Sequence, residues 1–208
     1  MIEYSKGNDH ELWTKFLHGN NQVLSLIYLR YVNALYDYGS KITPDRSLVK
    51  DCIQDVFCTI IRNRQSLSPT DNIQLYLFKA LKRQLVREIQ KSLKYREFDS
   101  DNSGRFEISF LQSFDHSEFE LTEEQKEALI SAIESLTARQ KEAIYLRFTR
   151  GMDYKEIAVI LNLNYQSARA LIHRAISKLR EILAEKSNYF SQILLCIFRK
   201  TGEGVLQQ

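Results

Sequence analysis

The feature that most constrains the fold is a run of three helical segments between residues 136 and 183, separated by two very short turns. Capping boxes open the first two segments, because paired side chains three positions apart can satisfy the free N–H groups of a first helical turn. Residues that tolerate a left-handed backbone can close them. The residues concerned are Thr137 with Gln140, Asp153 with Glu156, then Gly151, Asn162 and, as the cap of the third segment, Asn164. This spacing predicts a helix-turn-helix.

The third segment of this motif separates into two arcs when its residues are placed 100° apart. The apolar arc is expected to be core: Ala168, Ile172, Ala175, Leu179, Ile182 and Leu183. The opposite arc carries cationic and hydrogen-bonding side chains with small residues between them: Gln166, Arg169, Ala170, His173, Ser177 and Arg180, flanked by Arg174 and Lys178. Such a face suits the major groove of DNA, where side chains must reach phosphates and base edges. The alternative is a basic face that contacts only water.

The composition favours a helical chain without a disulfide framework. Only seven glycines and two prolines occur in 208 residues, which leaves little material for hairpins. The three cysteines, Cys52, Cys58 and Cys196, lack metal-ligand spacing, and an odd number without a signal peptide favours a reducing compartment. We therefore expect an all-α cytoplasmic protein with no metal site and no cofactor.

Charge is distributed unevenly along the chain. Residues 97–127 hold ten acids and two bases, a net charge of −8, whereas the whole chain carries +3, which leaves +11 for the rest. This pattern favours two small nucleic-acid-facing helical domains joined by a flexible acidic linker that nucleic acid repels. An ordinary acidic loop is the alternative. The expected limits are a first domain at 1–96, the linker at 97–121, a second domain at 122–186 and an extension at 187–208.

In the first domain, one helix is expected to begin with Thr43 as its cap and Pro44 at its first position, and to run to about Arg64. Its buried stripe is expected to be Val49, Cys52, Ile53, Val56, Phe57 and Ile60, and its exposed stripe Asp51, Gln54, Asp55, Cys58 and Arg62. Because no histidine or metal ligand is nearby, the acidic and amide side chains suggest a docking surface and not a catalytic site. A solvated polar face is the default alternative.

The following helix is strongly basic. Seven bases crowd its surface against one acid, Glu88, while Phe78, Leu81, Leu85 and Ile89 are expected to face inward; the bases are Lys79, Lys82, Arg83, Arg87, Lys91, Lys94 and Arg96. With Tyr76 and Tyr95 beside it, such a stripe can hold a phosphate backbone and stack an unpaired base. The alternative is a solvated basic face with a core aromatic. Residues 12–17 and 24–38 are expected to add two amphipathic helices to this domain's core.

Two stretches resemble a known family. "SLVKDCIQDVFCTIIRNRQSL" followed by "IQLYLFKALKRQLVREIQK" is similar to region two of bacterial RNA polymerase sigma factors, and residues 136–183 resemble their region four. With no recognisable region three between them, the chain resembles the extracytoplasmic-function (ECF) class over roughly residues 10–185. Two positions depart from the pattern: Leu171, where many relatives have a base, and Asn162, where they have glycine.

The resemblance implies a role for each surface. The expected contacts are Asp51, Gln54, Asp55 and Phe57 with the clamp coiled coil of core RNA polymerase; Lys79, Lys82, Arg83 and Arg87 with the melted minus-10 element; and Gln166, Arg169, His173, Arg174 and Lys178 with the minus-35 element. The loop "SLSPTDN" before the basic helix is implied in minus-10 reading, although it offers no aromatic side chain to wedge between bases. The acidic linker would thread toward the polymerase active-site cleft until nascent RNA displaced it.

The function that follows from this resemblance is that of a sigma factor, which binds core RNA polymerase and directs initiation at promoter DNA. The alternative is a stand-alone helix-turn-helix regulator, which would need an effector or receiver domain that the sequence does not show. We do not expect an enzyme or a small-molecule substrate, because the acids lie on a docking face or in the linker. An anti-sigma protein is a further partner to be considered. For residues 187–208, whose "NYFSQILLCIF" is too short to span a bilayer, packing, masking of a surface and membrane contact all stay open.

Overall fold

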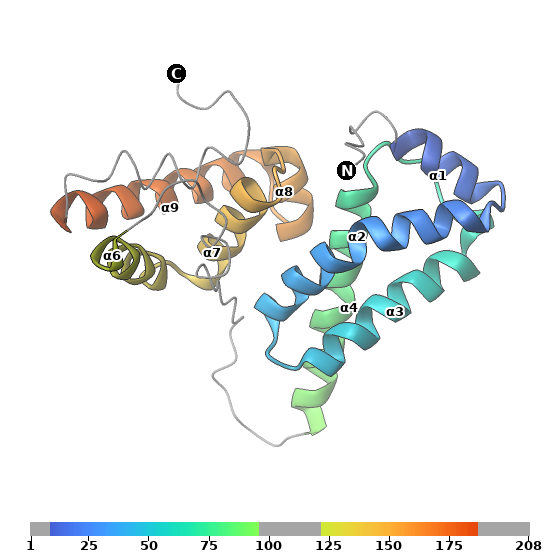
Figure 1. Cartoon of the computed structure of the whole chain (residues 1–208), viewed down its shortest axis with the longest axis horizontal. Helices are drawn as coiled ribbons and strands as arrows, with labels where there is room; N and C mark the ends of the chain where they lie inside the picture. The colour runs from blue at the N-terminus through green and yellow to red at the C-terminus, as the bar shows by residue number, and fades with distance from the viewer. Residues whose placement is uncertain (1–8, 96–121, 187–208) are drawn as a thin grey trace. The chain divides into compact units, whose positions relative to one another are not determined.

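The computed structural model describes residues 9–95 and 122–186, and every regular element in those two stretches is helical (Figure 1). The chain divides into two compact units, Met1–Ser103 and Gly104–Gln208. The all-α fold with two small helical units is thus confirmed. The expected linker at 97–121 and the extension at 187–208 lie outside the described residues, and the four domain limits stay predictions.

The first unit is built on three long helices and one short one. They are α1 (Asp9–Leu17), α2 (Asn21–Ile42), α3 (Arg46–Arg62) and α4 (Ile73–Tyr95), with a single 3₁₀ turn, η2 (Arg64–Ser66), after α3. In this unit α2 packs against α1, α3 and α4, and α3 packs against α4. The two amphipathic helices expected upstream of α3 are therefore confirmed.

The start of α3 differs from the sequence prediction. Asp45, and not Thr43, caps this helix, and its side-chain oxygen accepts hydrogen bonds from the N–H groups of Ser47 and Leu48, both at 3.0 Å. Thr43 instead ends α2, where its N–H donates to the Gly39 carbonyl at 3.1 Å. A carboxylate is the better cap here, since it satisfies free N–H groups and also lies at the positive end of the helix dipole. The predicted end near Arg64 is two residues too late, because α3 ends at Arg62.

The apolar stripe expected on α3 is buried as predicted, and so are Phe78, Leu81 and Leu85 of α4. Ile89 is only half-buried. At the centre of this core, α2 and α3 approach closely at Gly39: a Cβ added there would lie 2.7 Å from Val49 Cγ1 and 3.4 Å from Leu85 Cδ1. A glycine in a helix interior costs stability by itself, so its presence here reflects the space that the two neighbouring helices leave.

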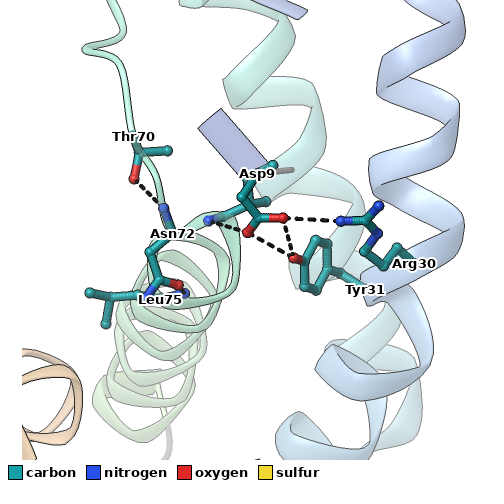
Figure 2. A network of polar contacts seen from close by, with 7 residues as sticks. Asp9, Arg30, Tyr31, Thr70, Asn72 and Leu75 are labelled. Carbon is teal, nitrogen blue, oxygen red and sulfur yellow. Dashed lines mark hydrogen bonds and ion pairs between the residues drawn. The ribbon is translucent and has the colours of Figure 1, made fainter. Parts of the chain in front are cut away.

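A buried carboxylate joins three helices of the first unit, as Figure 2 shows. Asp9, at the start of α1, accepts hydrogen bonds from the Arg30 guanidinium at 3.0 Å, from the Tyr31 hydroxyl at 3.0 and 3.2 Å, and from the N–H of Ile73 at 3.0 Å. Arg30 and Tyr31 belong to α2, and Ile73 is the first residue of α4. Burial, with the neighbouring Asp9 carboxylate, raises the pKa of Tyr31 to about 12. The phenol therefore stays a donor over the physiological range.

The second unit is formed by α6 (Glu123–Glu134), α7 (Ala138–Ile144), a π-helical turn η3 (Tyr145–Thr149), α8 (Tyr154–Leu161) and α9 (Tyr165–Lys186). The long α9 packs against α6, α7 and α8 (Figure 1). Helix α6 begins at Glu123, one residue after the expected start of the second domain. The π-helical turn was not predicted from the sequence.

The capping residues of the helix-turn-helix act as the sequence predicts. Both capping boxes are formed, Gly151 has φ +66°, and Asn162 is left-handed with φ +52°. The Asn164 side chain accepts from the N–H of Ser167 at 2.7 Å and so caps α9. Because each turn is specified by its own side chains, the short segment α8 is fixed between two defined corners.

Replacing Gly39 with alanine is expected to lower the free energy of unfolding of the first unit by about 1–3 kcal/mol, because the new methyl group overpacks against Val49. The chain has one tryptophan, Trp13, which is buried in this unit, so its fluorescence during urea unfolding reports this unit alone. In a Val49→Ala background the same substitution should be neutral or stabilising, since the space is then available. A Gly39→Ala protein more stable than the parent would contradict the close approach.

Candidate DNA-binding and docking surfaces

Helix α9 presents the two arcs that its sequence predicts. The apolar arc is buried, except that Ile182 is half-buried. The whole opposite arc is exposed: Gln166, Arg169, Ala170, His173, Ser177 and Arg180. Gln166, Arg169 and His173 recur at intervals of three and four residues, so they lie one above the other on one side of the helix. A DNA major groove can accept this surface, because small residues stand between its donors.

The two flanking bases of α9 are placed differently from each other. Arg174 is exposed, and its Nε donates to the Ala170 carbonyl at 3.3 Å within the same helix. The Lys178 ammonium donates to the carbonyl of Ser135 at 2.6 Å, directly after the end of α6. Lys178 therefore links α9 to the chain after α6 and also lies at the edge of the exposed face, a contact that was not predicted from the sequence.

Arginine side chains hold the corners of the helix-turn-helix. The Arg139 guanidinium donates to the carbonyl of Leu161 at 3.1 Å, which satisfies the C-terminal end of α8. Arg147, in the π-helical turn, donates to the carbonyl of Met152 at 3.0 Å and lies 5.0 Å from the centre of the Tyr154 ring. These contacts fix how α8 leads into α9, and thus how the exposed arc of α9 is presented.

The four α3 side chains expected to contact core polymerase lie on different faces of this helix. Asp51, Gln54 and Asp55 are exposed as predicted, whereas Phe57 belongs to the buried stripe, also as predicted, and meets the Tyr28 ring edge to face at 5.0 Å between ring centres. Asp55 faces α4, where its Oδ2 accepts from Gln84 Nε2 at 2.9 Å. Gln54 lies on the other side of the helix, toward α2. The exposed part of α3 therefore borders two grooves.

The groove between α2 and α3 has a volume of about 630 Å³ and is largely apolar. Its lining is Tyr28, Val32, Asn33 and Tyr36 of α2 with Lys50, Ile53, Gln54, Phe57, Cys58 and Ile61 of α3. Two of its large apolar side chains are open to solvent: Ile61 is 43% exposed and Tyr28 42%, and Leu29, the next residue of α2, is 69% exposed. An open apolar groove with polar residues at its edge is typical of a protein-binding surface.

The groove between α3 and α4 has a volume of about 510 Å³ and is basic. Arg62, Lys79, Arg83 and Arg87 line it together with Asp55, Gln84 and Tyr76. Arg87 Nη2 donates to Gln84 Oε1 at 2.7 Å, and Gln84 in turn donates to Asp55. Three of the four bases predicted to hold DNA are thus brought together here, while Lys82 is half-buried outside this lining.

The two tyrosines that could stack a base are not equivalent. Tyr76 packs against Trp13 with ring centres 5.1 Å apart, and burial raises the pKa of its hydroxyl. It is therefore a partly buried core aromatic that also contributes to the wall of the basic groove. The side chain of Tyr95 lies outside the described residues.

Sequence reasoning missed the α2–α3 groove and the Asp9 contacts. Tyr28 and Leu29 interrupt the simple amphipathic pattern of α2, because apolar residues there occupy more than one face; this was the available signal for the groove. Asp9 gave no local signal, since its partners are 21, 22 and 64 residues away in the chain.

Among residues 9–95 and 122–186, no group of three or more histidine, cysteine, aspartate or glutamate side chains could hold a metal ion. In the same ranges no helix is both long and apolar enough to cross a membrane.

The first unit is a helical bundle with an apolar and a basic groove, and the second contains a capped helix-turn-helix. These features are typical of helical DNA-binding proteins that also dock on a protein partner. Residues 120–179 match the family described as "Sigma-70, region 4". The chain is 24% identical over 156 residues to the ECF RNA polymerase sigma factor SigM of Bacillus subtilis. The aligned region covers 75% of this chain and 92% of that protein. It is 22% identical over 173 residues to the RNA polymerase sigma factor CarQ of Myxococcus xanthus, covering 82% and 95%.

A solved structure has the same fold: the sigma factor RpoE in complex with the anti-sigma factor NepR from Bartonella quintana superimposes with a TM-score of 0.54 and 21% identity, covering 77% of this chain and 96% of that one. These likenesses are all to sigma factors, the ECF type among them, which is the family that the region-two and region-four motifs resemble.

The two described cysteines are expected to differ sharply in reactivity. Burial raises the pKa of Cys52 to about 11, so at pH 8 it holds very little of the reactive thiolate, whereas Cys58 is exposed at the α2–α3 groove. Iodoacetamide at pH 8 should modify Cys58 rapidly and Cys52 only after unfolding, as followed by mass spectrometry of the separate peptides. Equal labelling rates in the folded protein would contradict the burial of Cys52.

Proposed function

We propose that this chain binds core RNA polymerase through its first unit and directs transcription initiation at promoters that carry matched minus-10 and minus-35 elements. The observation that carries the proposal is the exposed arc of α9, which from Gln166 to Ser177 lies within the residues that match sigma-70 region 4. The direct test is to mix the purified protein with core polymerase and to sequence the transcripts initiated on genomic DNA. Start sites that share two spaced elements are expected; start sites no different from those of core polymerase alone would oppose the proposal.

For the minus-35 element, we infer that α9 lies in the major groove with Gln166, Arg169 and His173 toward base edges. These residues occupy the first half of the helix, and the first turns of a recognition helix are the part that reaches the bases. Arg174 supplies a phosphate contact at the side. Lys178 can contact phosphate only at the edge of this face, because its ammonium is held by the Ser135 carbonyl.

For the minus-10 element, we infer that the basic groove between α3 and α4 follows the backbone of the opened strand. Lys79, Arg83 and Arg87 supply the positive charge there, with Lys82 at the margin. The loop that leads into α4 carries the exposed polar residues Ser68 and Asp71, which offer hydrogen-bonding groups to unpaired bases. Reading by hydrogen bonds suits this loop, since it contains no aromatic side chain.

For core polymerase, we infer that the α2–α3 groove and the adjoining polar stripe of α3 receive a helix of the clamp coiled coil. Asp51, Gln54 and Asp55 provide the polar edge, and Phe57 acts from beneath by supporting Tyr28 in the groove. An apolar groove of this size accepts an amphipathic helix, whose side chains would cover Tyr28, Leu29 and Ile61. Asp55 would take part in both surfaces, because it also accepts a hydrogen bond from Gln84 of α4 in the basic groove.

The relatives suggest one further partner. A structural neighbour is a sigma factor in complex with an anti-sigma factor, and an inhibitor of that kind would have to cover a surface that polymerase needs. The open apolar groove between α2 and α3 is the described surface that fits this requirement. We infer that the protein itself catalyses no reaction and acts in the cytoplasm, where bacterial polymerase works; a stand-alone regulator is disfavoured by the region-two likeness.

Asp51→Arg is expected to weaken binding to core polymerase at least tenfold, because a positive side chain replaces an exposed carboxylate on the docking stripe. Binding is measured with fluorescently labelled protein and purified core polymerase. Glu11→Arg is the matched control, since it makes the same charge change at an exposed position of α1 and should leave binding within about twofold. In the parent protein, core polymerase should also protect Cys58 from iodoacetamide. Full affinity of Asp51→Arg and full reactivity of Cys58 would remove this face from the interface.

Arg169→Glu is expected to reduce transcription from a promoter with a minus-35 element about tenfold or more, because it brings a carboxylate against phosphates or base edges and removes a donor. Arg180→Glu is the matched control: it is exposed on the same arc but lies eleven residues further along α9. Binding to core polymerase should be unchanged in both. Equal losses for the two variants would indicate a general electrostatic effect in place of recognition by the first half of α9.

A further inference from the structure

The loop between η2 and α4 is bound to α1 at Ser68. The indole Nε1 of Trp13 donates to the backbone carbonyl of Ser68 at 3.0 Å. Trp13 itself is buried, with its ring centre 5.2 Å from that of Phe16 and 5.1 Å from that of Tyr76. Because the Trp13 ring is rigid and has a single hydrogen-bond donor, its bond to the Ser68 carbonyl fixes the distance between the loop and α1.

The end of the loop is fastened by the Asp9 carboxylate. Asp9 Oδ2 accepts from the N–H of Ile73, so α1 provides a cap for α4 that is 64 residues away in the chain (Figure 2). The Asn72 side chain accepts from the N–H of Leu75 at 2.8 Å, and the two caps satisfy different N–H groups of the first turn. Asp9 is 4% exposed, and a carboxylate so deeply buried requires the partners that Arg30 and Tyr31 supply.

The start of the loop is fastened by Arg64. Its guanidinium donates to the side-chain oxygen of Asn21 at 3.0 Å and lies 5.0 Å from the centre of the Phe16 ring. Three anchors, at Arg64, Ser68 and Ile73, therefore bind the loop to α1 and the first residue of α2. Ser68, Pro69 and Asp71 lie between or beside these anchors and are exposed.

We propose that α1 is the positioning element for minus-10 reading, in which Trp13 and Asp9 hold the loop 67–72 and the first turn of α4 in the geometry that recognises unpaired bases. This inference rests on the proposed function. Neither residue needs to contact DNA. They act through the Ser68 carbonyl and the Ile73 N–H, so that the exposed side chains of the loop are already in place before the strand arrives.

The physical advantage is that the ordering cost of the loop is met on folding and not on binding. A base that is read by one or two hydrogen bonds is discriminated only if donor and acceptor positions are fixed, because hydrogen bonds weaken steeply with poor geometry. A loosened loop could rotate its groups toward a wrong base. Discrimination between bases should therefore suffer more than overall attraction, which comes from the bases of α4.

The test uses holoenzyme assembled from core polymerase and the full chain. Its ligand is a fluorescent single-stranded oligonucleotide that carries the non-template minus-10 sequence, compared with oligonucleotides changed at one base. Trp13→Phe keeps an aromatic ring against Phe16 and Tyr76 and removes the donor to Ser68. We expect the affinity ratio of correct to changed sequence to fall about three- to tenfold, the effect of one hydrogen bond. Affinity for core polymerase should stay within about twofold.

Two further variants separate positioning from simple loss of stability. Because Trp13 is the one tryptophan of the chain, an isosteric sulfur analogue without the N–H, benzothienylalanine, can be placed at this position alone by biosynthetic substitution. It should reproduce the loss of discrimination with the packing preserved. Ile27→Val, a buried truncation in α2, is the stability control and should leave the ratio unchanged. Asp9→Asn keeps the shape of the side chain but removes the charge that Arg30 faces. It should lower the affinity ratio of correct to changed sequence more than Trp13→Phe does.

Unchanged discrimination in both Trp13 variants would overturn the inference while leaving the proposed function intact. An equal fall in the Ile27→Val protein would also overturn it, because the effect would then be one of stability. A parent holoenzyme that does not distinguish minus-10 sequences, although it binds core polymerase, would refute the proposed function and this inference together.

Discussion

The two basic helices, α4 and α9, are held in place by the apolar face that each buries against its own unit. The arrangement of both units depends on this constraint. In α9 the buried Ala168, Ile172 and Ala175 alternate with the exposed Arg169 and His173. In α4 the buried Leu77, Phe78 and Leu81 stand behind the bases of the groove. A helix of this kind gains its stability from packing on one side, so the other side is free to carry charges that repel one another. In the proposed function, the cost of that repulsion would fall when a phosphate backbone binds.

Burial of the apolar faces does not by itself fix how the charged faces are aimed, and polar contacts at helix ends do this. In the second unit, Arg139 binds the last turn of α8 and Lys178 binds the chain after α6. In the first unit, Asp9 and Trp13 bind the start of α4 and the loop before it. Hydrogen bonds to helix-terminal groups are directional and use N–H and C=O groups that would otherwise lack partners, so they orient a helix more sharply than apolar packing can.

Helix α3 stands between the two grooves of the first unit, and this explains why its exposed face is polar but not uniform. Gln54 and Cys58 border the apolar groove with α2, while Asp55 and Arg62 border the basic groove with α4. A protein partner and a nucleic acid strand would then contact opposite sides of one helix. The hydrogen bond from Gln84 to Asp55 joins α3 to α4 on the basic side. In the proposed function, docking on polymerase and capture of DNA would therefore act on a single rigid element.

By itself, the sequence determined the local structure: the capping boxes, the left-handed Gly151 and Asn162, and the two arcs of α9 all follow from interactions within a few residues, which a linear pattern records. Its prediction of Thr43 as the cap of α3 was wrong, because nearby residues can both serve as caps and Asp45 supplies the better acceptor at the positive end of the helix dipole. The two grooves and the contacts of Asp9, Trp13 and Lys178 became visible only in the tertiary structure. These depend on groups brought together from distant parts of the chain, and the direction in which a side chain points across such an interface is set by the packing of whole helices and not by the residues beside it.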